Sequence, residues 1–300
     1  MTDRLAVVLV DKEPGPSSHY VVAEARRALG LRRVGHTGTL DPFAGGLLIL
    51  CVGRATRLVE YFHLLPKSYE AEIVFGEARD TDDRTGRVTE RLPPPPELDD
   101  ARIEAALAAS LGRSDQRPPD YSARRVDGDR AYEAARRGRP LALEARPVEV
   151  YRAELLGWTA PVARVRYSVS TGTYVRALAR DLGEALGCPA HLGALRRTRI
   201  GPFAASDAGP ASEIAWDGTG TSTPLAALAW LPSRELTGPE RTRIGHGQAI
   251  GGEGVRPPRT AVAGLDPGEL PVVLHADDEL VAVARRIDCE LRPEKVFDVS

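Results

Sequence analysis

The sequence contains few aromatic residues, a single methionine and no long apolar run. Aromatic residues occupy 5% of its 300 positions. No apolar stretch approaches the roughly 20 residues that a membrane-spanning helix needs. The N-terminal segment MTDRLAVVLVDKEPG has one short apolar run that ends in Asp11 and Lys12, which is typical of a first strand and unlike a signal peptide. We therefore expect a cytoplasmic protein that neither spans nor binds a membrane.

Cysteine is equally scarce. Cys51, Cys188 and Cys289 are odd in number, lie far apart and form no CxxC pair. This pattern excludes a disulfide framework and a cysteine-based zinc site. The six histidines show no metal-ligand spacing either. We expect three buried, reduced thiols and no bound metal.

Lysine is nearly absent, and the net charge is small. Only three of the 40 basic residues are lysines, and the formal net charge is −2. Residues 1–209 carry 31 basic and 28 acidic residues, whereas residues 210–300 carry 9 and 14. The charge of the whole chain therefore gives no support to a nucleic-acid partner.

Two segments are richer in arginine than the rest. Residues 124–139 hold six arginines against three acids, and residues 191–199 hold three arginines and no acid. A run of like charge is usually a solvated face of the protein. By themselves these segments therefore indicate no function.

The apolar periodicity predicts an irregular alternation of strands and helices. Strands are predicted over residues 5–10, 47–52, 67–75, 148–156, 162–169, 272–274 and 280–284. Helices are predicted over residues 18–29, 54–64, 99–111, 130–137 and 174–186. Residues 80–86 are typical of a polar turn, and Asp127-Gly128 is typical of a hairpin. This order predicts an α+β fold with a mixed, mostly antiparallel central sheet flanked by helices and loops.

The segment GHTGTLDPFAGG, residues 35–46, places one carboxylate among four glycines and a proline. Asp41 precedes Pro42, which favours an extended backbone and prevents a helix from continuing. A carboxylate held in such a loop can act as a nucleophile or as an acid or base. It can also simply bond its own backbone in an ordinary turn, and the spacing alone favours that simpler interpretation.

Seven segments, which follow one another in a fixed order along the chain, favour a catalytic role for Asp41 over an ordinary turn. They are LVDKEPGPSS (9–18), VGHTGTLDPFAGGLL (34–48), KSYEAEIVFG (67–76), DTDDRTG (80–86), PPDYSARRVDG (118–128), STGTYVRALARDLGEALG (170–187) and HLGALRRTRIGPF (191–203). Together they closely resemble the TruB-type tRNA pseudouridine-55 synthase family, over nearly all of residues 5–205. Two details depart from the family pattern: DKEPG stands where DKPxG is usual, and YSARRVDG has arginines where lysine is common.

The end of the chain resembles a second module more loosely. RTRIGHGQAI (241–250) and ELVAVARRIDCELRPEKVF (279–297) are similar to the small β-rich PUA-like domain that binds RNA in this family. The resemblance implies a pseudouridine synthase catalytic domain over residues 1–209, a junction over 210–232 and a PUA-like domain over 233–300.

The resemblance also implies a reaction. A uridine in the T-arm of tRNA is flipped out of its stack and isomerised to pseudouridine by an aspartate, an intramolecular transfer that needs no cofactor or metal. We expect the enzyme to act as a monomer with no obligate protein partner.

Specific residues follow from the matching motifs. Asp41 corresponds to the family's catalytic aspartate, Arg176 to the arginine that pairs with it, and Tyr69 to the active-site tyrosine that stacks on the base or removes the C5 proton. The residues implied to bind the substrate RNA are His36, Lys12, Lys67, Tyr174, Arg125 and Arg197.

Three alternatives stay open at this point. The chain could reshape RNA without catalysis, although the presence of Asp41, Tyr69 and Arg176 argues against that. It could hydrolyse glycosides, but that chemistry needs a second catalytic carboxylate, and the motifs indicate none. It could modify another RNA, as relatives do in guide complexes, yet the motifs favour the stand-alone bacterial type.

Overall fold

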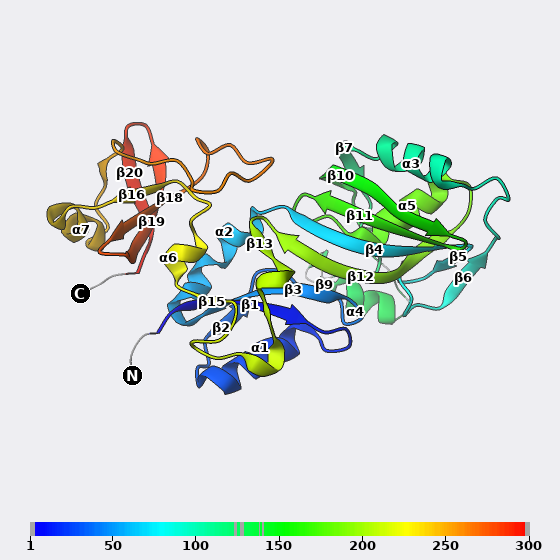
Figure 1. Ribbon diagram of the computed structural model, residues 1–300, viewed down its shortest axis with the longest axis horizontal. Helices are drawn as coiled ribbons and strands as arrows, with labels where there is room; N and C mark the ends of the chain where they lie inside the picture. The colour runs from blue at the N-terminus through cyan, green and yellow to red at the C-terminus, as the bar shows by residue number, and fades with distance from the viewer. Residues whose placement is uncertain (1–3, 123–124, 127–128, 138, 140, 298–300) are drawn as a thin grey trace. The chain divides into compact units, whose positions relative to one another are not determined.

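A computed structural model describes residues 4–122, 125–126, 129–137, 139 and 141–297 (Figure 1). The chain divides into two compact units. The first comprises Met1–Asp41, Leu47–Leu65 and Gly201–Ser300, and the second comprises Pro42–Gly46 and Pro66–Ile200. The chain therefore passes from one unit to the other directly after Asp41.

The first unit begins with a helix packed on two strands. β1 (Ala6–Lys12) lies beside β3 (Gly45–Val52), and α1 (Ser18–Leu29) packs against both. The Ser17 side chain caps the start of α1, and Gly30 ends the helix with a φ of 66°, a left-handed conformation that glycine adopts without strain. The buried core consists of Ala6, Val8, Val10, Val21, Val22, Ala25, Leu29, Val34, Leu48, Leu50, Val52 and Ile214. The helix and both strands predicted here are confirmed.

Shorter elements complete this part of the first unit. β2 (Val34–His36) pairs with β3 in antiparallel register. The helix predicted over 54–64 is a 3-10 turn (Gly53–Leu58) followed by α2 (Val59–His63). The low-pattern segment after residue 209 adds β14 (Gly209–Pro210) and β15 (Thr221–Ser222), both paired with β1, and the short helix α6 (Pro224–Ala227).

The C-terminal residues of the first unit form a separate small sheet. Its strands follow the order β16, β18, β19, β20 and β17, with α7 alongside. The bounds are β16 Ser233–Glu235, α7 Gly238–Gly245, β17 Ile250–Gly251, β18 Val272–Ala276, β19 Glu279–Ile287 and β20 Glu290–Val296. The two strands predicted over 272–274 and 280–284 lie in β18 and β19. The division into domains at 209 and 233 stays a prediction.

The second unit contains a sheet of five antiparallel strands in the order β12, β4, β11, β10 and β7. Their bounds are β4 Lys67–Phe75, β7 Gly112–Gln116, β10 Arg146–Thr159, β11 Val162–Val169 and β12 Ala190–Ile200. Odd-numbered residues of β4 are buried and most even-numbered ones are partly exposed, as the alternating sequence predicted. The mostly antiparallel sheet is thus confirmed.

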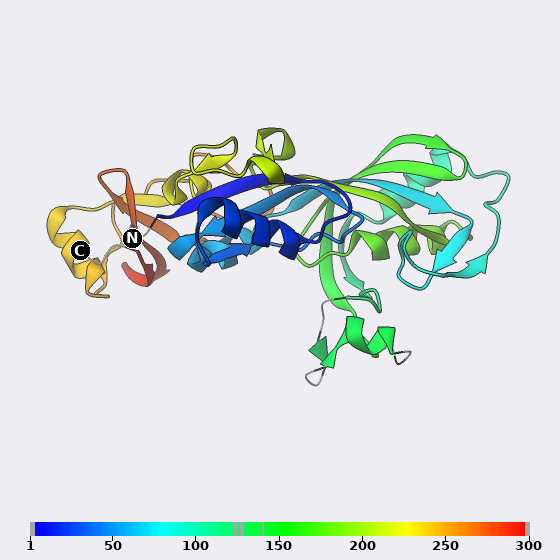
Figure 2. The ribbon, with the colours of Figure 1, turned by 90° about the horizontal axis from the view of Figure 1, so that it is seen from below.

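Two helices pack on this sheet, α5 (Val175–Ala185) along β12 and α3 (Asp100–Ala109) along β10. β5 (Glu77–Arg79) and β6 (Val88–Arg91) form a hairpin around the 80–86 turn. A second hairpin, β8 (Arg125–Val126) and β9 (Asp129–Arg130), leads into α4 (Ala131–Arg136) and stands away from the sheet of its unit (Figure 2). The predicted Asp127-Gly128 turn lies outside the described residues.

The cysteines follow the sequence prediction only in part. Cys51 and Cys188 are buried free thiols, whereas Cys289 is exposed. It lies in the turn between β19 and β20, where there is too little chain to cover it. In the described part of the chain, none of the helices combines the length and apolar character needed to cross a membrane.

Candidate active site

Asp41 lies in the middle of the loop that joins β2 to β3, residues 37–44, and the main chain next to it is tightly held. The Ser18 hydroxyl donates to the Leu40 carbonyl at 3.1 Å and accepts from the Leu40 N–H at 2.9 Å. Further back in the loop, the Thr37 N–H donates to the Ile49 carbonyl at 3.0 Å. Asp41 itself is half-buried. The loop is therefore fixed by main-chain bonds, and its carboxylate is outside regular structure.

His36 is the last residue of β2, directly before this loop. Its Nδ1 accepts a hydrogen bond from the Gly38 N–H at 3.3 Å, so the neutral ring carries its proton on Nε2. The His19 ring meets the His36 ring edge-on, with centroids 5.4 Å apart. The half-buried His36 ring is thus oriented from two sides.

Lys12, which the motif implied to bind RNA, is the last residue of β1. Its side chain is fully buried, and Nζ donates to the main-chain carbonyls of Glu13 at 3.0 Å and Pro16 at 2.8 Å. The ammonium group therefore stabilises the turn between β1 and α1. A contact between Lys12 and RNA stays a prediction.

The residues that follow Asp41 pack within the second unit. The Arg84 guanidinium lies over the Phe43 ring, 5.7 Å from its centroid. Gly45 and Gly46 pair in parallel with Arg196 and Arg197 of β12. Gly46 has a φ of 100°, and a Cβ there would lie 2.3 Å from the Arg197 carbonyl oxygen. Only glycine therefore fits where β3 pairs with β12.

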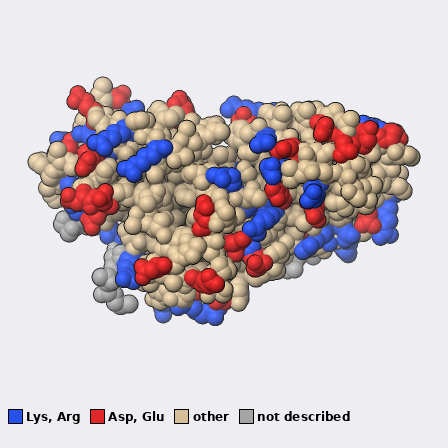
Figure 3. Space-filling model, viewed as in Figure 1, with Lys and Arg blue, Asp and Glu red and all other residues tan. Residues whose placement is uncertain are grey.

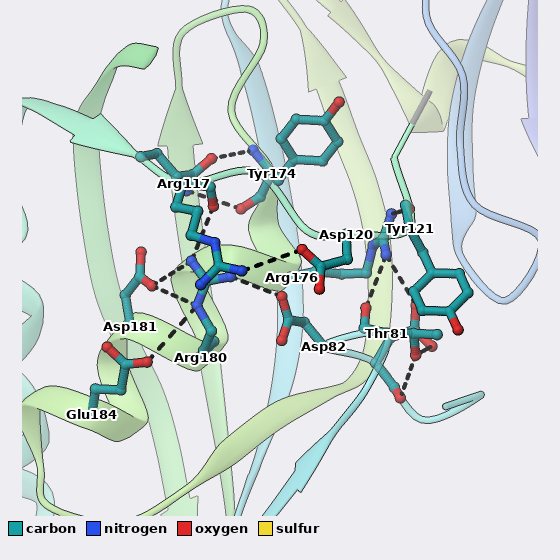
Figure 4. Close-up of polar contacts among 12 residues, drawn as sticks. Thr81, Asp82, Arg117, Asp120, Tyr121, Tyr174, Arg176, Arg180, Asp181 and Glu184 are labelled. Atoms are coloured by element: carbon teal, nitrogen blue, oxygen red, sulfur yellow. Dashed lines mark hydrogen bonds and ion pairs between the residues drawn. The ribbon is translucent and has the colours of Figure 1, made fainter. Parts of the chain in front are cut away.

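Arg176 is a buried arginine in the first turn of α5 (Figure 4). Its Nη1 donates to the Thr81 carbonyl at 2.9 Å, and its Nη2 donates to the Tyr121 carbonyl at 3.0 Å. Its Nη1 also lies 3.6 Å from the Asp83 carboxylate. Arg176 is therefore held inside the second unit rather than on its surface. Its predicted pairing with Asp41 stays a prediction.

Asp83 has a structural role that the sequence analysis missed. The side chain is buried, and Oδ1 accepts from the Thr81 hydroxyl at 2.9 Å, the Thr85 N–H at 2.8 Å and the Thr85 hydroxyl at 2.5 Å. These three hydrogen bonds fix the position of the carboxylate within the turn. The polar-turn interpretation of residues 80–86 gave no sign of this role. The sequence did contain a signal for it. DTDDRTG has two adjacent acids, Asp82 and Asp83, and the helix predicted over 174–186 has two arginines one helical turn apart, Arg176 and Arg180.

Arg180, one turn after Arg176, binds the neighbouring acid. Its Nη1 lies 2.9 Å from the Asp82 carboxylate, and its Nη2 donates to the Arg117 carbonyl at 3.0 Å. Asp82 has a φ of 57°, an uncommon conformation for a residue with a side chain. As Figure 4 shows, the two arginines of α5 connect the 81–83 turn with the 117–121 segment.

Tyr69, Arg197 and Lys67 are brought together on the buried side of the sheet. Tyr69 of β4 lies directly opposite Arg197 of β12 and Tyr167 of β11, and residues in such positions share a face. Lys67 is two residues from Tyr69, on the same face and buried. Burial, and then the charge of Arg197, lower the pKa of Lys67 to about 7.

Arg197 is therefore not on the exposed basic surface that the segment 191–199 predicted. Its side chain is buried with a relative exposure of 2%, whereas those of Arg196 and Arg199 are exposed. Alternation puts Arg196 and Arg197 on opposite faces, and the register irregularity between Arg197 and Arg199 puts Arg199 on the exposed side.

Two other predicted residues occupy the second unit. Tyr174 precedes α5, and its main-chain N–H and carbonyl bond both ends of the Gln116 side-chain amide at 2.8 and 3.1 Å. Arg125 lies in β8. Figure 3 shows basic and acidic residues interspersed on the face drawn. In the described ranges no group of three or more His, Cys, Asp or Glu is placed to hold a metal ion.

Two family models match the chain. One, described as the TruB family pseudouridylate synthase N-terminal domain, covers residues 26–175, and the other, described as the tRNA pseudouridylate synthase B C-terminal domain, covers residues 176–215. The tRNA pseudouridine synthase B of Thermobifida fusca is 44% identical over 83% of this chain and 87% of its own. That of Parasynechococcus marenigrum is 40% identical over 98% of this chain and 97% of its own.

Solved structures agree with the family models. A structure described as a Cbf5-Nop10-Gar1 complex matches with a TM-score of 0.73 at 26% identity, over 98% of this chain and 85% of that one. An H/ACA RNP bound to a substrate RNA matches with a TM-score of 0.72 at 25% identity. Fold and motifs thus define a pseudouridine synthase. The chain belongs to the TruB family of pseudouridylate synthases.

Proposed function

We propose that this protein is a tRNA pseudouridine synthase that isomerises the T-loop uridine to pseudouridine. The observation that carries this proposal is the similarity of nearly the whole chain to proteins named tRNA pseudouridine synthase B. The fixed main chain around Asp41 supports it, because nucleophilic chemistry needs a carboxylate in a defined position.

In the proposed reaction the bond between N1 and C1′ of the uridine breaks. The freed base turns, C5 forms a bond to C1′, the C5 proton leaves for solvent, and N1 takes up a proton from solvent. Asp41 either attacks C1′ or stabilises positive charge there, as carboxylates do in glycoside chemistry. One proton is lost and one is gained, so substrate and product are isomers and the reaction consumes no oxidant, nucleotide or cofactor.

Arg176 is proposed to keep Asp41 ionised. A desolvated carboxylate has a raised pKa unless an opposite charge compensates. The Arg176 guanidinium is itself held by two carbonyls and Asp83, so its orientation is fixed before substrate binds. Asp83 accepts three hydrogen bonds and is better suited to hold Arg176 than to serve as the second catalytic acid of a glycoside hydrolase.

Tyr69, Tyr174, His36 and Arg125 are assigned to the RNA, and contacts of Lys12, Lys67 and Arg197 with the RNA stay predictions. A stacked uridine must be extruded to reach a carboxylate. Tyr69 and Tyr174 are proposed to contact the extruded base, and His36 to occupy the space that it leaves or to contact the RNA loop. Arg125 and the exposed Arg196 and Arg199 are proposed to contact phosphates. We propose that residues 233–300 are a PUA-like RNA-binding domain and that the protein works as a cytoplasmic monomer.

The test is tritium release from tRNA transcripts labelled at C5 of uridine. We expect one tritium released per tRNA, with pseudouridine mapped to the T loop and with no added metal or nucleotide. Turnover that EDTA abolishes while the RNA stays folded would contradict the cofactor-free mechanism. Release mapped to another uridine would keep the chemistry and overturn the substrate.

A further inference from the structure

The first turn of α1 contains two adjacent serines whose side chains have different partners. The Ser17 hydroxyl accepts from the Tyr20 N–H at 3.1 Å and caps the helix. The Ser18 hydroxyl instead bonds Leu40, 22 residues further along the chain. Capping of α1 is thus accounted for by Ser17, and Ser18 is available for the loop.

The Ser18 hydroxyl satisfies both polar groups of the Leu40 main chain. It accepts from the N–H at 2.9 Å and donates to the carbonyl at 3.1 Å. The carbonyl of Leu40 belongs to the peptide bond that Asp41 completes, so this contact fixes the plane of the peptide that carries the carboxylate. Ser18 is 1% exposed, and water cannot readily replace the hydroxyl there.

The base of α1 is itself held in place from two directions. The buried Lys12 ammonium binds the Glu13 and Pro16 carbonyls just before the helix. On the other side of Ser18, the His19 ring contacts the His36 ring at the start of the same loop. Ser18 and His19 of α1 therefore contact the chain on both sides of the segment 37–39, at Leu40 and at His36.

We infer that Ser18 is a positioning residue for Asp41, acting through the Leu40 peptide. Its hydroxyl sets the direction in which the carboxylate leaves the main chain and restricts the rotation of the peptide between Leu40 and Asp41. Loss of the hydroxyl leaves a buried N–H and a buried carbonyl to find other partners, and the loop can satisfy them only by shifting. The inference rests on the proposed function, in which Asp41 reacts at C1′.

The experiment compares four proteins in single-turnover tritium release from C5-labelled tRNA: wild type, Ser18→Ala, Ser18→Thr and Ser17→Ala. The last is the matched control, since it removes a hydroxyl from the same helical turn without touching the loop. Affinity for tRNA is measured by filter binding, and folding by thermal melting, so that each rate is compared among folded proteins bound to RNA.

We expect Ser18→Ala to lower the single-turnover rate by about 10- to 100-fold, the effect of a small displacement of a reacting group. Its affinity for tRNA should stay within about twofold of wild type, because the lost bonds do not involve RNA. Ser18→Thr keeps the hydroxyl and should recover most of the rate. Ser17→Ala should lower the melting temperature and leave the rate within about twofold.

A Ser18→Ala rate equal to that of Ser17→Ala overturns the inference. So does a loss of rate that Ser18→Thr fails to recover although the Thr variant melts like wild type. If Ser18→Ala does not fold, Ser18→Cys, which has similar volume and a weaker donor, replaces it with the same expected order. A wild-type protein that releases no tritium defeats the proposed function instead, and the two failures are thereby separated.

Discussion

Lys67 is a cationic side chain in a buried position, next to a second cation. Burial and the charge of Arg197 lower the pKa of the ammonium to about 7. On the same face of the sheet the other ionisable groups facing it from β4, β11 and β12 are Tyr69, Tyr167 and Arg197. At physiological pH a large share of the folded molecules therefore carries a neutral amine at this position.

This shift predicts a pH-dependent stability. Between about pH 7 and pH 10.5 the unfolded chain holds a proton that the folded chain lacks, so the free energy of unfolding rises with pH, by about 1.4 kcal/mol per pH unit for one such group. Lys67→Met removes this contribution. In urea unfolding at pH 7, 8 and 9, the stability of the wild type should rise relative to that of the variant. Two parallel curves would contradict the assignment.

Gly46 gives a second prediction for a single residue. Gly46→Ala places a Cβ 2.3 Å from the Arg197 carbonyl oxygen and imposes a φ of 100° on a residue with a side chain. We expect a loss of well over about 1 kcal/mol in the free energy of unfolding. Gly112→Ala is the matched control, because Gly112 has a φ of 92° and nothing within 4 Å of its Cβ position. Equal losses in urea unfolding would show that backbone strain alone, and not the contact with Arg197, requires glycine at position 46.

At the scale of elements, periodicity missed β12, β20, α6, α7 and most strands of five residues or fewer. It predicted β1, β3, β4, β10, β11, β18, β19 and the helices α1 to α5, and the 67–75 and 162–169 strands have the predicted bounds. These elements have alternating or helical patterns that burial enforces. The short strands β14 and β15 were missed because two residues carry no period, and they exist only through pairing with β1. Asp83 and Ser18 were missed for a related reason, since their roles depend on partners 93 and 22 residues away.

A prediction at this scale concerns α5, in which Arg176 and Arg180 carry guanidinium groups one helical turn apart. Arg176→Lys cannot reproduce two guanidinium bonds to separate carbonyls. We expect it to lower single-turnover tritium release by about 100-fold or more, as the loss of a preorganised charged group does. Arg180→Lys breaks the corresponding contacts with Asp82 and Arg117. It should cost stability while the rate stays within about threefold of wild type. Equal rate losses would mean that the whole helix, and not Arg176, sets the activity.

At the scale of the whole molecule, the chemistry and the affinity for RNA are expected to be separable. The net charge of −2 means that binding relies on local groups of arginines, whose phosphate contacts release counterions. Asp41→Asn leaves those arginines in place and removes only the ionised carboxylate. We expect tritium release to fall below detection. The affinity for tRNA, and the slope of its logarithm against the logarithm of salt concentration, should match wild type within error.

Filter binding from 50 to 200 mM salt measures this slope. The positive control is a double variant, Arg196→Ala with Arg199→Ala, which should flatten the slope by about 1 to 2. Residual tritium release by Asp41→Asn would exclude Asp41 as the reacting group. A lost affinity would show instead that the carboxylate helps to hold the RNA, because catalysis and binding would then depend on the same side chain.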